Sequence, residues 1–303
     1  MTMPTRDPAD ALRAFLRSGE FARRGAVMTD LDGTAVLERE GRIYLPPSVE
    51  SALQHIRNLG RPVIANTLRF PKSVIRVFGD EWHRATGTDL PLVALKGSQV
   101  GRVVRSASGE TAFEEWHATP LEPAEIEEVL IGVEGMVEEG VDDLLVFYYR
   151  RDWRQGERIW TADPVHVEAT WEKYRSASSV TSSRVAGLRA MLCEEPVCMV
   201  FLLISTPQDR LMAYQHMQRT NFVTHAGVSK RSGAVAMAQH LDLDLAASIG
   251  AGDAPPDDFL AAVGFAVLVG TNEVDYKGLV DTVRLAGIAE LGELLAVVGE
   301  RLE

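Results

Sequence analysis

The sequence predicts an α/β fold in which a second domain interrupts a parallel sheet. Three short apolar runs, at 25–29, 61–66 and 91–95, are typical of buried parallel strands. Apolar residues at helical spacing between Ser48 and Gly60 predict a helix that joins the first two strands. Strand, helix and strand in this order are the beginning of a parallel α/β layer.

The pattern changes after about residue 100. Amphipathic helices now alternate with aromatic-rich runs at 143–150 and 198–205 that are typical of strands. The same region holds four of the five tryptophans. We therefore expect a separate α+β domain over residues 101–225.

The first pattern returns at residue 226. Apolar runs at 246–253 and 264–270 predict two more strands of the parallel sheet, and a last helix is expected over 285–298. Residues 1–100 and 226–303 are therefore expected to form one α/β core into which the α+β domain is inserted.

Composition and charge narrow the classes of function. The 303 residues are 46% hydrophobic and 24% charged, which is typical of a folded protein with a sizeable core. The formal net charge of -12 argues against a general nucleic-acid or anionic-membrane binder, because both need a basic surface. No apolar stretch is long enough to span a membrane, and the acidic N-terminus does not resemble a secretory signal, so we expect a cytoplasmic protein. Cys193 and Cys198 lack the usual metal or redox spacing and are expected to be reduced thiols.

The segment TDLDGT follows the first predicted strand and contains Asp30, Asp32, Gly33 and Thr34. Ligands of open α/β sheets bind beyond the carboxyl ends of the strands. Two carboxylates held close together repel each other, and a divalent cation that prefers oxygen ligands, such as Mg²⁺, relieves the repulsion. Gly33 permits a turn that a β-carbon would obstruct.

A second acidic segment, GAGDAPPDD, follows the strand predicted at 246–253. Asp253 and Asp257 would complete a metal site at the same edge of the sheet, whereas a solvated acidic loop is the alternative for this segment alone. Asp258, the neighbour of Asp257, is the other candidate in this segment.

The two acidic segments, together with Thr67 and Lys230, resemble the four motifs of the haloacid dehalogenase superfamily. Asp30–Thr34 is similar to motif one, Thr67 to motif two, Lys230 to motif three, and Asp253 with Asp257 to motif four. The resemblance implies a Rossmann-like parallel-sheet core with an inserted α+β cap domain. An insertion between motifs two and three is similar to that of the branch that contains sucrose-phosphate, trehalose-phosphate and mannosylglycerate-phosphate phosphatases.

The resemblance also implies a role for each motif residue. Asp30 would be the nucleophile that forms a phosphoryl-aspartate, and Asp32 the general acid and base. Thr67 would donate a hydrogen bond to the phosphoryl group, and Lys230 would neutralise charge. Mg²⁺ would be bound by the Asp30 side chain, the Asp32 backbone carbonyl, Asp253 and Asp257, the last directly or through water.

Two positions depart from the family pattern. The sugar-phosphatase branch commonly has Thr-Gly-Arg in motif two, whereas this chain has Thr67-Leu68-Arg69. After the third strand the related enzymes often have Asn-Gly, and here Lys96 precedes Gly97. Arg69 and Lys96 are candidate substrate-binding residues, with ordinary surface positions as the alternative for each.

The function expected from these residues is a Mg²⁺-dependent phosphomonoester hydrolase. Its substrate would be a small phosphorylated metabolite, most simply a sugar phosphate or a glycosyl-glycerate phosphate, with no nucleic-acid or membrane partner. A phosphomutase of the same superfamily and a non-catalytic phosphate-binding protein are the alternatives, and the oligomeric state stays open. Arginines near aromatic residues in the inserted domain either form a specificity surface or take part in ordinary packing; they are Arg150, Arg151, Arg154, Arg158 and Arg175.

Overall fold

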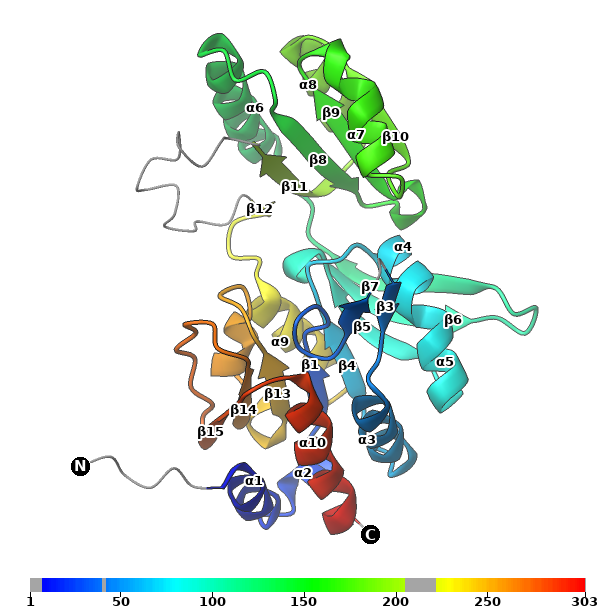
Figure 1. The fold of residues 1–303 in the computed structure, drawn as a ribbon, viewed down its shortest axis with the longest axis vertical. Helices are drawn as coiled ribbons and strands as arrows, with labels where there is room; N and C mark the ends of the chain where they lie inside the picture. The colour runs from blue at the N-terminus through cyan, green and yellow to red at the C-terminus, as the bar shows by residue number, and fades with distance from the viewer. Residues whose placement is uncertain (1–6, 40–41, 205–221, 303) are drawn as a thin grey trace. The chain divides into compact units, whose positions relative to one another are not determined.

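The structure is a computed structural model that describes residues 7–39, 42–204 and 222–302. The chain divides into two compact units (Figure 1). The core unit comprises residues 1–117 and 228–303, and the inserted unit comprises residues 118–227.

The core unit contains an eight-stranded sheet in the order β15-β14-β13-β1-β4-β5-β6-β7. Its strands, in chain order, are β1 (Val27–Thr29), β4 (Val63–Asn66), β5 (Leu90–Ala94), β6 (Gln99–Arg105), β7 (Thr111–Ala118), β13 (Ile249–Gly252), β14 (Phe265–Val269) and β15 (Asp281–Leu285). All pairs from β15 to β5 are parallel, and the β5–β6 pair is antiparallel. The predicted α/β class with a mainly parallel core is confirmed.

Strand β1 lies in the middle of this sheet, between β13 and β4 (Figure 1). Thr29 is in register with Ala251 on one side and with Ala65 on the other. Because the three strands are parallel, the segments that follow them leave the sheet at one edge, and two of these segments are the acidic motifs.

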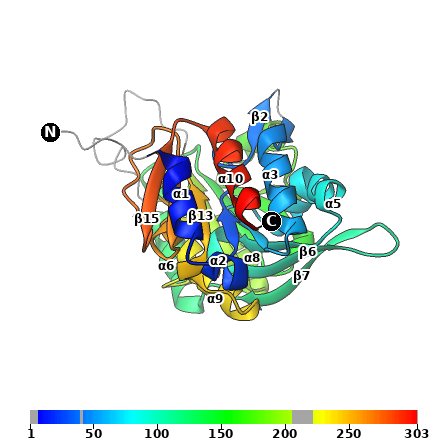
Figure 2. The ribbon, with the colours of Figure 1, turned by 90° about the horizontal axis from the view of Figure 1, so that it is seen from below.

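Helices cover both faces of the core sheet. Figure 2 shows α3 (Pro47–Asn58) and α10 (Ile288–Leu302) on one face and α9 (Lys230–His240) on the other. Close packing of α3 against α10 depends on glycine, since a β-carbon on Gly299 would lie 2.0 Å from the His55 ring. The remaining helical segments of the core are α1 (Pro8–Leu16), α2 (Glu20–Arg24), α4 (Pro71–Val74), the π-helical η1 (Ile75–Gly79), α5 (Asp80–Thr86), η2 (Leu95–Gly97), η7 (Leu245–Ala247) and η8 (Asp258–Ala261).

Two expectations for the core need correction. The boundary expected at residue 101 falls inside β6, which pairs with β5 and carries β7 as the next strand, so the inserted unit begins at Ala118. The last helix was expected from Leu285, but this residue ends β15 and the helix begins at Ile288. In both places strands that contain polar and charged residues lack the continuous apolar pattern that identified the buried strands.

The inserted unit is a five-stranded sheet in the order β10-β9-β8-β11-β12. Helices α6 (Pro123–Glu138) and α8 (Val185–Glu194) pack on it around a core that includes Leu130, Trp160 and Leu188. The other elements among its described residues are β8 (Leu145–Arg150), η3 (Trp153–Gln155), β9 (Glu157–Thr161), η4 (Pro164–His166), α7 (Val167–Lys173), β10 (Ser179–Ser182), β11 (Val197–Leu203) and β12 (Phe222–Val223). An antiparallel-rich sheet with helices is the expected α+β arrangement.

Some of the arginines that were considered for a specificity surface have structural partners. The Arg150 side chain is buried and lies 2.5 Å from Glu194 and 3.2 Å from Glu195. Ordinary packing therefore accounts for Arg150. Across the described parts of both units, each helix is too short or too polar to cross a membrane.

Candidate active site

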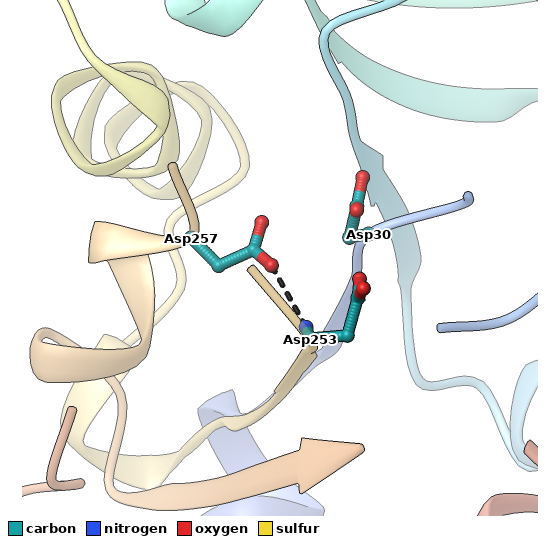
Figure 3. Close-up of side chains that lie close together, drawn as sticks. All are labelled: Asp30, Asp253 and Asp257. Carbon is teal, nitrogen blue, oxygen red and sulfur yellow. Dashed lines mark hydrogen bonds between the residues drawn. The ribbon is translucent and has the colours of Figure 1, made fainter. Parts of the chain in front are cut away.

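Three aspartates from two segments meet at the carboxyl edge of the core sheet. Asp30 directly follows β1, Asp253 directly follows β13, and Asp257 lies four residues further on (Figure 3). One carboxylate oxygen of each lies within 4.8 Å of the corresponding oxygens of the other two. Asp30 and Asp257 are buried and Asp253 is partly buried. Carboxylate oxygens at this spacing can bind a metal ion that prefers oxygen ligands.

Lys230 joins two of these aspartates. It is the first residue of α9, whose start is fixed by a capping box between Ser229 and Ser232. Its Nζ lies 2.8 Å from Asp30 Oδ1 and 2.6 Å from Asp257 Oδ1, and the side chain is 2% exposed. Three ionised carboxylates and one ammonium leave two negative charges, which a divalent cation would balance.

Asp257 is held on both of its oxygens. Oδ1 accepts a hydrogen bond from Lys230, and Oδ2 accepts from the backbone N–H groups of Asp253 and Ala254, each at 2.9 Å. Since these contacts occupy much of the carboxylate, Asp257 is better placed to shape the loop and fix Lys230 than to bind a cation directly. Asp258 contacts the start of α9 instead, because its Oδ1 accepts a hydrogen bond from the N–H of Arg231 at 2.8 Å.

Asp253 is oriented by residues to which sequence reasoning gave no role. Thr34 Oγ1 donates to Asp253 Oδ1 at 2.8 Å, and the Asn272 side chain donates to the Asp253 carbonyl oxygen at 3.0 Å. The sequence could have identified Asn272 as a candidate site residue, because it lies just after the predicted strand at 264–270, at the same edge of the sheet as Asp253. Gly33 has φ +77°, and a β-carbon there would lie 2.6 Å from Asp253 Oδ2, so the expected need for glycine is confirmed.

Asp32 does not join the carboxylate cluster through its side chain. Its carboxylate forms two hydrogen bonds with Arg69, each of 2.7 Å. Thr67 is buried at the end of β4, and its Oγ1 accepts from the N–H of Arg69 at 3.2 Å. That contact leaves the Thr67 hydroxyl proton available for an acceptor on a ligand.

Lys96 lies in the tight turn η2, next to motif two. Its backbone N–H donates to the Thr67 carbonyl oxygen at 3.2 Å, and its backbone is left-handed, with φ 60° and ψ 21°. Burial lowers the pKa of its ammonium group, and the charge of Asp258 acts in the opposite direction. A lysine in this conformation is strained, as residues at ligand sites often are.

Asp30 and Asp253 hold protons more tightly than exposed carboxylates do. Burial raises the pKa of Asp30 from 3.8 to about 7, with the nearby charge of Asp257 acting in the same direction and Lys230 opposing both. Burial also raises the pKa of Asp253. Lys230 stays charged, since Asp30 and Asp257 outweigh its burial and raise its pKa. The ionised forms of Asp30 and Asp253 are therefore disfavoured by their surroundings, a cost that a bound cation would relieve.

We expect Gly97→Ala to disturb the turn that positions α9. A β-carbon on Gly97 would lie 2.1 Å from the carbonyl oxygen of Ser229, and the backbone there has φ +104°. Overpacking and backbone strain together should lower the free energy of unfolding by roughly 2 kcal/mol or more, as measured by urea denaturation. Gly87→Ala is the matched control, because Gly87 has φ +66° but open space around it. Equal stability of the two variants would contradict this account of the turn.

Comparison of structures, and not comparison of whole sequences, relates this chain to known proteins. No protein-family model matches the sequence, and no curated protein sequence matches it significantly. Solved structures do match. A sugar phosphatase of subclass IIB of the haloacid dehalogenase superfamily has a TM-score of 0.65 at 15% identity, over 92% of this chain and 100% of that one.

Two further structures match over similar lengths. A phosphatase of the same superfamily from Bacteroides thetaiotaomicron has a TM-score of 0.61 at 16% identity, over 91% of this chain and 96% of its own. A Plasmodium vivax protein described as a HAD/COF-like hydrolase has a TM-score of 0.66 at 17% identity, over 94% of this chain and 99% of its own. The chain therefore has the fold of the haloacid dehalogenase superfamily phosphatases, as its motifs predicted.

Proposed function

We propose that this chain is a Mg²⁺-dependent phosphomonoester hydrolase that acts through a phosphoryl-aspartate at Asp30 on a small phosphorylated metabolite. The observation that carries the proposal is the buried cluster in which Asp30 and Asp257 share Lys230 beside Asp253. The likeness to phosphatase structures supports phosphoryl transfer in general. The cluster adds a nucleophile, a fixed cation and a set of metal ligands at one place.

Asp30 is the nucleophile of the proposed reaction. Its Oδ1 is held by Lys230 at 2.8 Å, which fixes the carboxylate and reduces its repulsion of an incoming phosphate. One oxygen of Asp30 attacks phosphorus while the bond to the leaving oxygen breaks, which gives an acyl phosphate. When bound, Mg²⁺ would screen the charge between the carboxylate and the phosphate.

The residues that would hold Mg²⁺ come from both acidic segments. Asp30 and Asp253 supply carboxylate oxygens, and the backbone carbonyl of Asp32 is a third ligand in the proposal. Asp257 acts through water, because its own oxygens already contact Lys230 and two backbone N–H groups. Oxygen ligands together with retained waters suit Mg²⁺.

Asp32 and Thr67 complete the proposed site. Asp32 gives a proton to the leaving oxygen in the first step and recovers one from the attacking water in the second step. The Thr67 hydroxyl donates to a phosphoryl oxygen. Lys96 is a candidate contact for the rest of the substrate, because its backbone N–H donates to the Thr67 carbonyl oxygen and the residue is partly buried. The proposed substrate class is a sugar phosphate or a glycosyl-glycerate phosphate.

The test of this function is phosphate release from a panel of substrates. The panel contains sugar phosphates, glycosyl-glycerate phosphates and an aryl phosphate, each with Mg²⁺ and with chelator. We expect release only with Mg²⁺, at a rate that depends on the sugar. Absence of release from every substrate by the folded, Mg²⁺-loaded protein would refute the hydrolase. Turnover that appears only on addition of a sugar bisphosphate would identify a phosphomutase instead.

We expect Mg²⁺ affinity to fall with pH below about 7. The pKa of Asp30 in the metal-free fold is about 7, so at lower pH the cation must displace a proton from this ligand. For one proton, the apparent affinity should fall by roughly tenfold per pH unit well below 7. Titration calorimetry between pH 5 and pH 8 measures both the affinity and the protons released. An affinity that does not change over this range would contradict the assignment of Asp30 as a ligand.

The same pKa has a consequence for the metal-free protein. Because the pKa of Asp30 is higher in the folded state than its usual 3.8, folding favours the protonated carboxyl group. This contribution to stability is present at low pH and is lost as the pH rises from about 4 to about 7. Stabilisation by Mg²⁺ should therefore be larger at pH 8 than at pH 5, as thermal unfolding would show.

A further inference from the structure

Arg69 is held in place at both its backbone and its side chain. Its N–H donates to Thr67 Oγ1 at 3.2 Å, and its carbonyl oxygen accepts from the N–H of Leu95 at 3.1 Å. At the other end, Nη1 donates to the hydroxyl of Ser73, a buried residue of α4, at 3.1 Å. The guanidinium is thus fixed relative to motif two before any ligand binds.

The fixed guanidinium of Arg69 forms two hydrogen bonds with the carboxylate of Asp32. Nε and Nη2 each donate to a different oxygen of Asp32 at 2.7 Å, which is the two-point geometry that sets both position and orientation. The Arg69 side chain is 22% exposed, and that of Asp32 is 52% exposed. Without a partner, so exposed a carboxylate would sample several rotamers.

We propose that Arg69 is a positioning residue that orients Asp32 for its proton transfers, and that it acts through Asp32 instead of binding the substrate. The inference rests on the proposed function. Three of the five guanidinium N–H groups already donate within the protein, two to Asp32 and one to Ser73. The sequence had left open a contact with a substrate anion or an ordinary surface arginine, and this geometry favours neither.

The orientation of Asp32 matters because this residue transfers a proton in each of the two steps. In the first step the carboxyl group of Asp32 gives its proton to the leaving oxygen as the bond from Asp30 to phosphorus forms. In the second step the carboxylate takes a proton from the water that attacks the phosphoryl-aspartate, which restores the starting form. A protonated carboxyl group keeps acceptor lone pairs on both oxygens, so both guanidinium contacts can persist while one oxygen carries the proton, and the orientation is kept through both steps.

The test compares Arg69→Gln and Arg69→Lys with wild type on two substrates. An aryl phosphate has a good leaving group that needs little protonation, whereas an alkyl phosphate such as a sugar phosphate needs the acid. With the alkyl phosphate we expect kcat to fall by about 10²-fold in both variants while KM changes little. With the aryl phosphate the first step should survive and the second should slow, which gives a burst of one aryl alcohol per enzyme before slow turnover.

The lysine variant is informative because it keeps the charge but cannot form the two-point contact. Ser73→Ala, which removes one anchor of the guanidinium, should give a smaller loss with the same substrate dependence. The control is Arg84→Gln, since Arg84 pairs on the surface with Glu50 and Glu81 and should leave the rates unchanged.

Each other outcome would overturn the inference. A rise in KM for both substrates without a burst would show that Arg69 binds the substrate phosphate. Unchanged rates would show an ordinary surface arginine, and equal losses on both substrates together with a lowered Tm would show a structural role. Failure of the wild type to hydrolyse either substrate would reject the proposed function itself, and the role of Arg69 with it.

Discussion

Asp30→Asn should abolish phosphate release while the protein stays folded. Removing a catalytic nucleophile typically costs at least about 10⁴-fold in kcat, and asparagine lacks the anionic oxygen that must attack phosphorus. The substitution keeps the shape of the side chain, so the neighbouring backbone need not move. Phosphate release from the best substrate of the panel, measured at saturating Mg²⁺, gives the size of the loss.

The effect of Asp30→Asn on stability has the opposite sign to that of most buried substitutions. In the metal-free protein the buried carboxylate has a raised pKa, which means that its ionised form is disfavoured by folding. A neutral side chain removes this penalty, and Lys230 keeps its contact with Asp257. At pH 8 without Mg²⁺ we therefore expect a Tm at or above that of wild type, whereas stabilisation by Mg²⁺ should be lost.

Asp89→Asn is the control for this variant. Asp89 lies on the surface of the same unit and pairs with Arg102 at 3.1 Å. Its substitution should leave turnover unchanged and should alter the free energy of unfolding by no more than about 0.5 kcal/mol. If a preparation of Asp30→Asn that is confirmed to carry the substitution showed near-normal turnover, the covalent mechanism would be disproved.

Lys230→Met should cause the largest loss of stability. The Lys230 side chain is 2% exposed and is the cation that Asp30 and Asp257 share. Removing one member of a buried ion pair leaves an uncompensated charge and typically costs roughly 3–5 kcal/mol. Turnover should also fall by roughly 10²–10³-fold, because the charge near the phosphate is lost.

The pH dependence of this variant separates electrostatics from packing. Near pH 5 Asp30 is largely protonated, since its pKa is about 7. The repulsion between Asp30 and Asp257 is therefore weaker at pH 5 than at pH 8. The destabilisation of Lys230→Met should therefore be smaller at pH 5 than at pH 8, as measured by urea denaturation. Arg231→Met is the control, because Arg231 is the next residue of α9 and its side chain is exposed. If the two variants proved equally stable at pH 8, the buried ion-pair network would not exist as described.

Much of the site was predictable from the sequence because its residues follow strands. Asp30 and Asp253 directly follow β1 and β13, and adjacent parallel strands bring such residues together without any knowledge of side-chain contacts. Thr67 follows β4 by the same logic. The acidic character of both segments then indicated a cation.

What could not be predicted depends on contacts between distant segments. The pairing of Asp32 with Arg69 joins residues 37 positions apart, and no local pattern encodes it. The hydrogen bond from Asn272 to Asp253 likewise depends on how the loop after β14 folds back. The strands β6 and β7 were missed because their mixed polar sequence lacks the continuous apolar run that is typical of buried parallel strands.

The most direct test of the central claim is to find the phosphoryl group on Asp30. Asp32→Asn lacks the base for the second step, so the intermediate should accumulate when this variant is mixed with an aryl phosphate and Mg²⁺ and then quenched in acid. Peptide mass mapping should find one phosphoryl group on the peptide that contains Asp30, absent with chelator and removed by hydroxylamine. Mg²⁺-dependent turnover by the wild type, with no phosphoryl group on Asp30 of the variant or with one on another residue, would contradict the account.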